Sequence, residues 1–272
     1  MTTLRLLDTF SGIGGFSYAA ERIVGGFETV AFVEREPYCQ QILSKHWPSV
    51  PIYDDITTFS PEPYSADVVC GGFPCQDISK AGKQAGIKEG TRSGLFYELM
   101  RVIRLVRPRY VVLENVSAII SNGLDTVLGE LAEAGFDAEW ACIPASAVGA
   151  CHQRNRWWLV AYANNTGMEA ARSKQQSARL EQHRELGFTA NTSSERLERR
   201  WPSGSAAHRL SPDWRSYLSK PVLCRGDDGL SGRVDRLKAL GNAVVPQVAA
   251  IPLARVKELS DNALHHYPYR GG

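Results

Sequence analysis

The chain has 272 residues, 43% hydrophobic and 22% charged, which is long enough for one large hydrophobic core and unlike a disordered chain. No stretch approaches the roughly 18 consecutive apolar residues of a membrane span, and the N-terminus lacks the apolar run of a secretory signal. We therefore expect a cytoplasmic protein. The six cysteines form no C-x-x-C pair, so we expect neither a zinc site nor a disulfide scaffold.

The formal net charge of +2 is unevenly distributed along the chain. Residues 1–163 hold 14 basic and 18 acidic side chains, a net charge of −4, whereas residues 164–215 and 216–272 each carry +3. Such an excess is often only a solvated surface, but it also allows a polyanionic partner.

The first 163 residues predict strands that alternate with helices. Apolar runs predict strands at 4–7, 29–34, 51–53, 66–70, 110–113, 138–143 and 157–161, and helical periodicity covers 16–23, 38–46, 95–106 and 124–134. This alternation predicts an α/β fold with a parallel sheet covered on both faces.

The pattern changes after residue 163. Residues 164–219 are rich in Ser, Arg, Gln, Asn and Glu, whereas apolar periodicity returns at Val244, Val248, Ile251 and Val256 in a helix expected after Gly241-Asn242. We expect a large domain over 1–163, a small irregular segment over 164–229, and a segment over 230–272 that returns to the large domain.

A glycine-rich turn follows the first strand, in the sequence Asp8-Thr-Phe10-Ser-Gly12-Ile13-Gly14-Gly15. Such a turn can be an ordinary tight connection, or it can let a nucleotide-like ligand approach the backbone. Glu34, at the end of the next strand, can accept the hydroxyls of a ribose, and Asp55 can accept a hydrogen bond from an adenine amino group. These residues favour an adenosine-containing cofactor, with both NAD and S-adenosylmethionine open.

Cys75 lies in the tight turn Gly71-Gly72-Phe73-Pro74-Cys75-Gln76, directly after a predicted central strand. Open α/β sheets hold their reacting groups at this edge, and a thiolate there is a nucleophile. The alternative is an inert buried cysteine, which is our interpretation of Cys70.

Two further groups follow later strands. Glu114 ends the strand at 110–113, where partial desolvation can raise its pKa so that it donates to a ring nitrogen. Arg154 and Arg156, in His152-x-Arg154-x-Arg156, lie at the entry to a strand and are expected on the same face.

Taken together, these motifs resemble the cytosine-5 DNA methyltransferase family. The matching blocks are DTFSGIGGF (8–16), Glu34, DDI (54–56), GGFPCQ (71–76), GLFYEL (94–99), ENV (114–116), HQRNR (152–156) and GNAVVP (241–246). The resemblance implies a Rossmann-like, S-adenosylmethionine-dependent methyltransferase sheet with a small, irregular target-recognition domain. The chain departs from the family's frequent Pro-Gln at Cys151-His152.

The resemblance also implies roles for individual residues. Cys75 would be the nucleophile, Glu114 would engage the cytosine edge, and Arg154 with Arg156 would orient the base and the catalytic groups. The residues implied around S-adenosyl-L-methionine are Phe10, Gly12, Ile13, Gly14, Glu34, Asp55, Ile56, Leu95, Asn242 and Val244.

The implied reaction is methyl transfer to carbon 5 of a cytosine flipped out of double-stranded DNA by a monomeric enzyme, without a metal. Basic residues of the insert would contact DNA; they include Arg172, Lys174, Arg179, Arg199 and Arg200.

Three alternatives remain open at this point: a cytosine-5 methyltransferase that acts on RNA, a DNA-binding relative that no longer turns over, and a dinucleotide-dependent oxidoreductase. The non-catalytic relative is disfavoured because Cys75, Glu114 and Arg156 are all present. The oxidoreductase leaves Pro74-Cys75 and the arginine pair unexplained.

Overall fold

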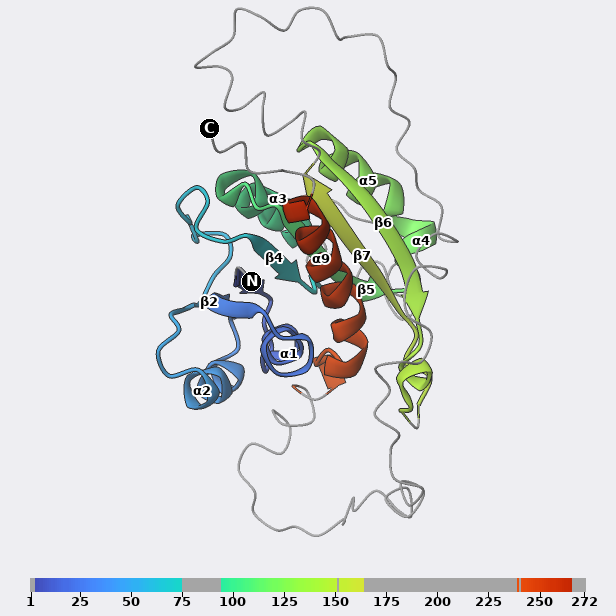
Figure 1. Cartoon of the computed structure of the whole chain (residues 1–272). Helices are drawn as coiled ribbons and strands as arrows, with labels where there is room; N and C mark the ends of the chain where they lie inside the picture. The colour runs from blue at the N-terminus through green and yellow to red at the C-terminus, as the bar shows by residue number, and fades with distance from the viewer. Residues whose placement is uncertain (1–2, 75–93, 151, 164–238, 240, 266–272) are drawn as a thin grey trace, which may run out of the picture.

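The protein is described from a computed structural model that covers residues 3–74, 94–150, 152–163, 239 and 241–265. Within these residues seven strands form one sheet (Figure 1). The strands are β1 (Leu4–Thr9), β2 (Phe27–Val33), β3 (Ile52–Tyr53), β4 (Val68–Gly71), β5 (Tyr110–Val116), β6 (Phe136–Ile143) and β7 (Arg156–Ala163).

Helices connect and cover these strands. They are α1 (Gly15–Tyr18), which continues directly as the π-helix η1 (Ala19–Val24), then α2 (Pro37–His46), α3 (Leu95–Val106), α4 (Ile119–Asn122), α5 (Leu124–Glu133), the 3₁₀ helix η2 (Ala145–Val148) and α9 (Pro246–His265). No helix in the described part of the chain is long and apolar enough to cross a membrane.

The sheet has the strand order β3-β2-β1-β4-β5-β7-β6. Neighbouring strands from β3 to β5 pair in parallel, as expected, whereas β7 runs antiparallel to both β5 and β6. The prediction of a fully parallel sheet is therefore wrong for β7, which runs opposite to β6 and to the other strands. The reason is local: the link from β6 to β7 is only the short segment around η2, too short for the helical crossover that parallel neighbours require.

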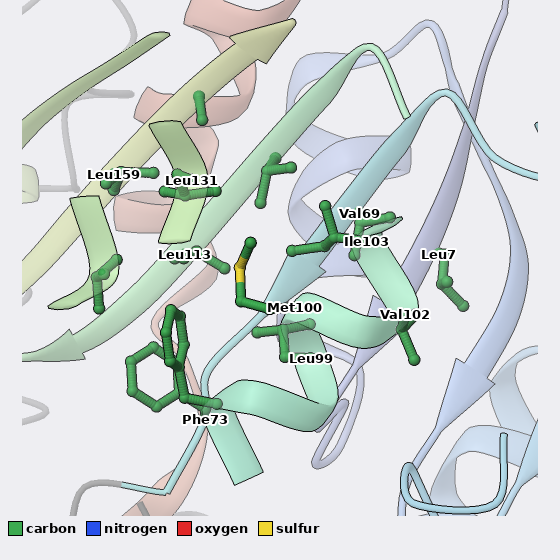
Figure 2. Packing of buried hydrophobic residues seen from close by; sticks show 14 of the residues in the cluster. Leu7, Val69, Phe73, Leu99, Met100, Val102, Ile103, Leu113, Leu131 and Leu159 are labelled. Carbon is green, nitrogen blue, oxygen red and sulfur yellow. The ribbon is translucent and has the colours of Figure 1, made fainter. Parts of the chain in front are cut away.

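Each face of the sheet has its own hydrophobic core, because side chains alternate along a strand. On β1, Leu7 belongs to the core under α3 and α5, whereas Leu6 belongs to the core under α1 and α9. Figure 2 shows the first of these cores, in which Leu99, Met100 and Ile103 of α3 pack against the sheet.

Helix α3 illustrates how the sequence sets one of these contacts. Its buried residues Phe96, Leu99, Met100, Ile103 and Val106 follow the three- and four-residue spacing of one helical face. The helix ends at Val106, because Pro108 disfavours helical backbone at the residue before it, Arg107. Arg107 caps the helix in a left-handed conformation with φ of 53°.

The C-terminal helix α9 packs against α1, η1 and β7, on the face of the sheet opposite α3 (Figure 1). Val248 and Val256 are buried there, which confirms the helical face predicted for this segment. Val244, however, precedes the helix, which begins at Pro246, because proline is suited to the first turn of a helix.

Candidate active site

One edge of the sheet gathers the residues that the sequence singled out. The parallel strands β1, β2, β3, β4 and β5 all end at this edge, and antiparallel β7 begins there. Chain segments far apart in sequence therefore meet at a single rim, which is where open α/β sheets place their ligands.

The glycine-rich turn at the end of β1 depends on positive φ angles. Gly12 has φ of 55° and Gly14 has φ of 84°, and the non-glycine residue Phe10 also takes a positive value, 51°. A Cβ on Gly12 would meet nothing within 4 Å, so the space beside this residue is open. The turn therefore has the backbone geometry and the free side that a bound ligand needs.

Trp47, at the C-terminal end of α2, packs against this turn at Gly14. A Cβ on Gly14 would lie 2.7 Å from the Trp47 ring, and the indole Nε1 donates a hydrogen bond of 2.9 Å to the carboxylate of Glu21. The other oxygen of Glu21 accepts from the backbone amide of Thr29 on β2. Sequence reasoning missed both Trp47 and Glu21, because their roles depend on contacts between separate elements.

Glu34 follows β2 and is bonded directly to the glycine-rich turn. Its Oε2 accepts a 2.6 Å hydrogen bond from the amide of Gly12, and its Oε1 accepts a 2.8 Å bond from the amide of Glu36. With 9% exposure, the residue is nearly buried. Its carboxylate is thus held in one orientation beside the turn, as expected for a group that recognises a ligand.

Asp55 and Ile56 lie just beyond β3. Asp55 Oδ1 accepts hydrogen bonds from the backbone amide and the hydroxyl of Thr57, and these bonds lower the pKa of the carboxyl group. The side chain of Ile56 is buried, and its carbonyl accepts a hydrogen bond from Arg101 of α3. Leu95, the first residue of α3, packs against the same hydrophobic cluster as Ile56.

Asp8, within β1, is a buried carboxylate that sequence reasoning left without a role. Its Oδ2 accepts hydrogen bonds from the hydroxyl of Ser17, at 2.8 Å, and from the backbone amide of that residue. Its Oδ1 is buried and has no hydrogen-bond partner within the described residues. Burial raises the pKa of Asp8 to about 7.

Cys75, the expected nucleophile, lies outside the described residues, which reach Pro74. The segment leading to it is anchored to β5, because Asn115 Nδ2 donates a 3.1 Å hydrogen bond to the carbonyl of Phe73. A Cβ on Gly72 would lie 3.2 Å from Glu114 Oε2. The turn before Cys75 therefore passes directly beside the Glu114 carboxylate.

Glu114 forms an ion pair with Arg156 at the rim. Arg156 Nε lies 2.9 Å from Glu114 Oε1, and the side chain of Glu114 is only 14% exposed. Burial raises the pKa of Glu114 to about 6, although Arg156 and, more weakly, Arg154 favour its charged form. The sequence placed Glu114 at the end of its strand, and β5 continues two residues further, to Val116.

Arg154 and Arg156 do not share a strand face, contrary to the expectation. β7 begins at Arg156, and Arg154 lies before it with a positive φ of 29°. The guanidinium of Arg154 donates to the carbonyl of Gly241 at 2.9 Å and to that of Ala243 at 2.8 Å. The two arginines thus bind different partners.

The C-terminal segment before α9 reaches the glycine-rich turn. A Cβ on Gly15 would lie 3.0 Å from the carbonyl oxygen of Val244 and 3.1 Å from its Cβ. Asn242, two residues earlier, is exposed. Asn242 and Val244 are two of the expected cofactor residues and lie more than 200 positions after the glycine-rich turn in sequence. The fold nevertheless brings them to the same edge of the sheet as the turn.

Two cavities border this region. One of about 550 Å³ is lined by Ile13, Gly14, Gly15, Tyr18, Arg22, Ile42, His46, Trp47, His152, Arg154 and residues 243–246. Another, of about 660 Å³, includes Asp55, Tyr53 and Phe59 in its lining. Ile13 and Val244 line the first of these two cavities, whereas Asp55 lines the second.

Comparison with known proteins places this chain in a family. The family described as C-5 cytosine-specific DNA methylase matches residues 4–209. The chain belongs to this family. It is 35% identical over 164 residues to the type II methyltransferase M.CviJI of Paramecium bursaria Chlorella virus IL3A, and 31% identical over 174 residues to M.HhaI of Haemophilus parahaemolyticus.

These matches involve part of each protein. They cover 58% and 62% of this chain, and 43% and 52% of the two relatives, so the chain spans about half the length of the curated relatives it matches. A mutant of DNMT2 from Spodoptera frugiperda has a similar fold, with a TM-score of 0.50 and 23% identity over 60% of this chain and 51% of that one. The family resemblance inferred from the sequence is thereby confirmed, as is the α/β methyltransferase fold.

Proposed function

We propose that the chain is a DNA (cytosine-5-)-methyltransferase that uses S-adenosyl-L-methionine. The observation that carries this proposal is the partly buried Glu114–Arg156 pair, which lies beside the turn leading to Cys75 and at the same rim as the glycine-rich turn. Family membership and this arrangement together favour the activity over simple DNA binding, which would not need a carboxyl group with a raised pKa.

The residues around the glycine-rich turn fit the cofactor chemically. The open side of Gly12 admits a ligand close to the backbone, and the carboxylates of Glu34 and Asp55 can accept hydrogen bonds from ribose hydroxyls and an adenine amino group. Phe10, Ile13, Gly14, Ile56, Leu95, Asn242 and Val244 complete the proposed set. When bound, the cofactor supplies an electrophilic methyl group.

The cytosine would be activated by this chain's own side chains. The Cys75 thiolate adds to carbon 6 of the ring, and the electron pair displaced from the carbon 5–carbon 6 bond makes carbon 5 nucleophilic. The raised pKa of Glu114, about 6, keeps a fraction of this carboxyl group protonated near neutral pH, and the protonated form donates a hydrogen bond to N3 as charge accumulates there. After methylation, a base such as water takes the carbon 5 proton, the electron pair of that bond re-forms the carbon 5–carbon 6 double bond, and the carbon 6–sulfur bond breaks to release the thiolate.

Arg156 would hold Glu114 in place during these steps. Its 2.9 Å contact fixes one carboxyl oxygen, which leaves the other for the base edge. Arg154 is the second arginine of the proposed pair, and its guanidinium contacts the C-terminal segment at Gly241 and Ala243.

DNA would reach the rim with its target cytosine flipped out of the duplex, since a stacked base cannot present carbon 6 to a thiol. We propose residues 164–229 as the target-recognition segment; they fall in the part of the chain outside the described residues. Their basic side chains suit contacts to phosphates.

Covalent trapping tests this function. A DNA duplex with 5-fluorocytosine at the target position, identified first by bisulfite sequencing of DNA from expressing cells, lets Cys75 add and methylation proceed. Fluorine then replaces the proton that must leave, so we expect a detergent-stable protein–DNA adduct that requires S-adenosylmethionine and is absent from Cys75→Ala. Methylation of the unmodified site without any adduct on the fluorinated one would contradict the covalent mechanism, and adducts only with fluorinated RNA would identify RNA as the substrate.

A further inference from the structure

Arg154 joins two parts of the rim that are distant in sequence. Its two terminal nitrogens bond the carbonyls of Gly241 and Ala243, at 2.9 and 2.8 Å, and these carbonyls flank Asn242 on either side. The planar guanidinium presents its donors as a rigid fork, so two such bonds fix the path of the backbone between them. Arg154 thus restrains the backbone on both sides of Asn242.

The backbone of Arg154 takes an unusual conformation at this point. Its φ of 29° belongs to a region that residues other than glycine rarely adopt, and such a conformation persists only where surrounding contacts enforce it. The residue lies directly before β7, two positions from Arg156. This conformation directs the side chain towards the C-terminal segment while Arg156 contacts Glu114.

The segment that Arg154 holds also contacts the glycine-rich turn. The carbonyl of Val244 lies so close to Gly15 that a Cβ there would approach it to 3.0 Å. Arg154 and His152 line the 550 Å³ cavity together with Gly14 and Val244. Gly241 and Asn242 are themselves exposed, so packing restrains them little, and the two bonds from Arg154 matter more for their placement.

From these contacts we propose that Arg154 is a positioning residue for the cofactor, which holds residues 241–244 against the glycine-rich turn. In this role it would differ from Arg156, which acts on the base through Glu114. The inference rests on the proposed function, because it takes Asn242 and Val244 as cofactor-binding residues. It predicts that loss of Arg154 weakens cofactor binding more than it slows the chemical steps.

The test compares Arg154→Ala and Arg154→Lys with wild-type protein, using calorimetry with S-adenosylhomocysteine and steady-state methylation kinetics. We expect Arg154→Ala to raise the Kd and the cofactor KM about 10- to 100-fold, while kcat at saturating cofactor falls less than about threefold. Arg154→Lys, which can restore one of the two bonds, should raise the Kd about 3- to 10-fold. If the alanine variant fails to fold, the Kd of Arg154→Lys alone tests the inference.

Arg5→Ala is the matched control. Arg5 also uses its guanidinium in a fork, towards Asp67 at 3.1 and 3.2 Å, but it lies at the opposite end of β1. We expect Arg5→Ala to leave the Kd for S-adenosylhomocysteine unchanged. A wild-type Kd in the Arg154 variants together with a reduced kcat would overturn the inference. Arg154 would then act in orienting the cytosine, as the family resemblance implies. Wild-type protein that does not bind S-adenosylhomocysteine would instead overturn the proposed function, and the inference with it.

Discussion

Glu114 and Arg156 lie two residues out of register on adjacent antiparallel strands, and their side chains meet on one face of the sheet. Glu114 pairs with Trp158 across the β5–β7 ladder, and Val116 pairs with Arg156. The diagonal contact joins Nε and Oε1 at 2.9 Å. This geometry exists only because β7 is antiparallel to β5, which brings its first residue to the edge where β5 ends.

Replacing Glu114 with Gln should remove the acid without removing a hydrogen-bonding group. We expect kcat to fall on the order of 10²- to 10⁴-fold, because the amide cannot hold a proton for N3 as a carboxyl group does. The Kd for S-adenosylhomocysteine should stay within about threefold of the wild-type value. Single-turnover methylation and calorimetry measure the two effects, and a kcat within threefold of wild type would exclude Glu114 as the acid.

Glu34→Ala should weaken cofactor binding by about 1–3 kcal/mol, since a carboxylate that binds ribose hydroxyls is lost. The variant also loses the bonds to the amides of Gly12 and Glu36, so thermal unfolding must be measured alongside calorimetry. Glu28→Ala, an exposed position on the same strand, is the control. Equal affinities of the two variants would remove Glu34 from the site.

Two glycine substitutions should have opposite effects on stability. Gly14→Ala places a Cβ against Trp47 at a residue with φ of 84°, so we expect a loss of about 1–3 kcal/mol in the free energy of unfolding. Gly129 lies on the exposed face of α5, where an added Cβ would have open space around it. We expect Gly129→Ala to raise the free energy of unfolding by about 0.5–1 kcal/mol. Urea unfolding measures both, and a Gly14→Ala variant as stable as wild type would mean that the Trp47 ring moves aside freely.

Asp8→Asn should change how stability depends on pH. Burial raises the pKa of Asp8 from 3.8 to about 7, so the folded state binds this proton more tightly than the unfolded state. The stability contributed by the protonated carboxyl is therefore present below about pH 4 and is lost as the pH rises towards 7. Asparagine cannot ionise. The free energy of unfolding of the variant should therefore rise relative to that of the wild type by on the order of 2–4 kcal/mol as the pH increases from 4 to 8.

Chemical unfolding at several pH values from 4 to 8 measures this difference. Ser17 can still donate to the amide oxygen of asparagine, which keeps the bonds that Asp8 Oδ2 accepts. A constant difference across the range would show that Asp8 does not titrate in it.

The sequence predicted the residues whose environment is local. Glu34 and the glycine-rich turn were identified because a strand end and a glycine pattern lie within one βαβ unit, and the structure joins them by the Gly12–Glu34 hydrogen bond. The direction of β7 was not predictable in this way, since an apolar run has the same composition in either direction. Trp47 was missed because its contact with Gly14 depends on how α2 packs, and packing is not periodic in sequence.

The reversed direction of β7 also determines which of its two ends reaches the rim. The strand starts at the rim with Arg156 and ends at Ala163, opposite Phe136 at the far edge. The chain is next described at Ala239, whose carbonyl bonds the amide of Ala243 beside Arg154 at the rim. The rim thus takes the carboxylate of Glu114 from a strand that ends there and the guanidinium of Arg156 from a strand that begins there.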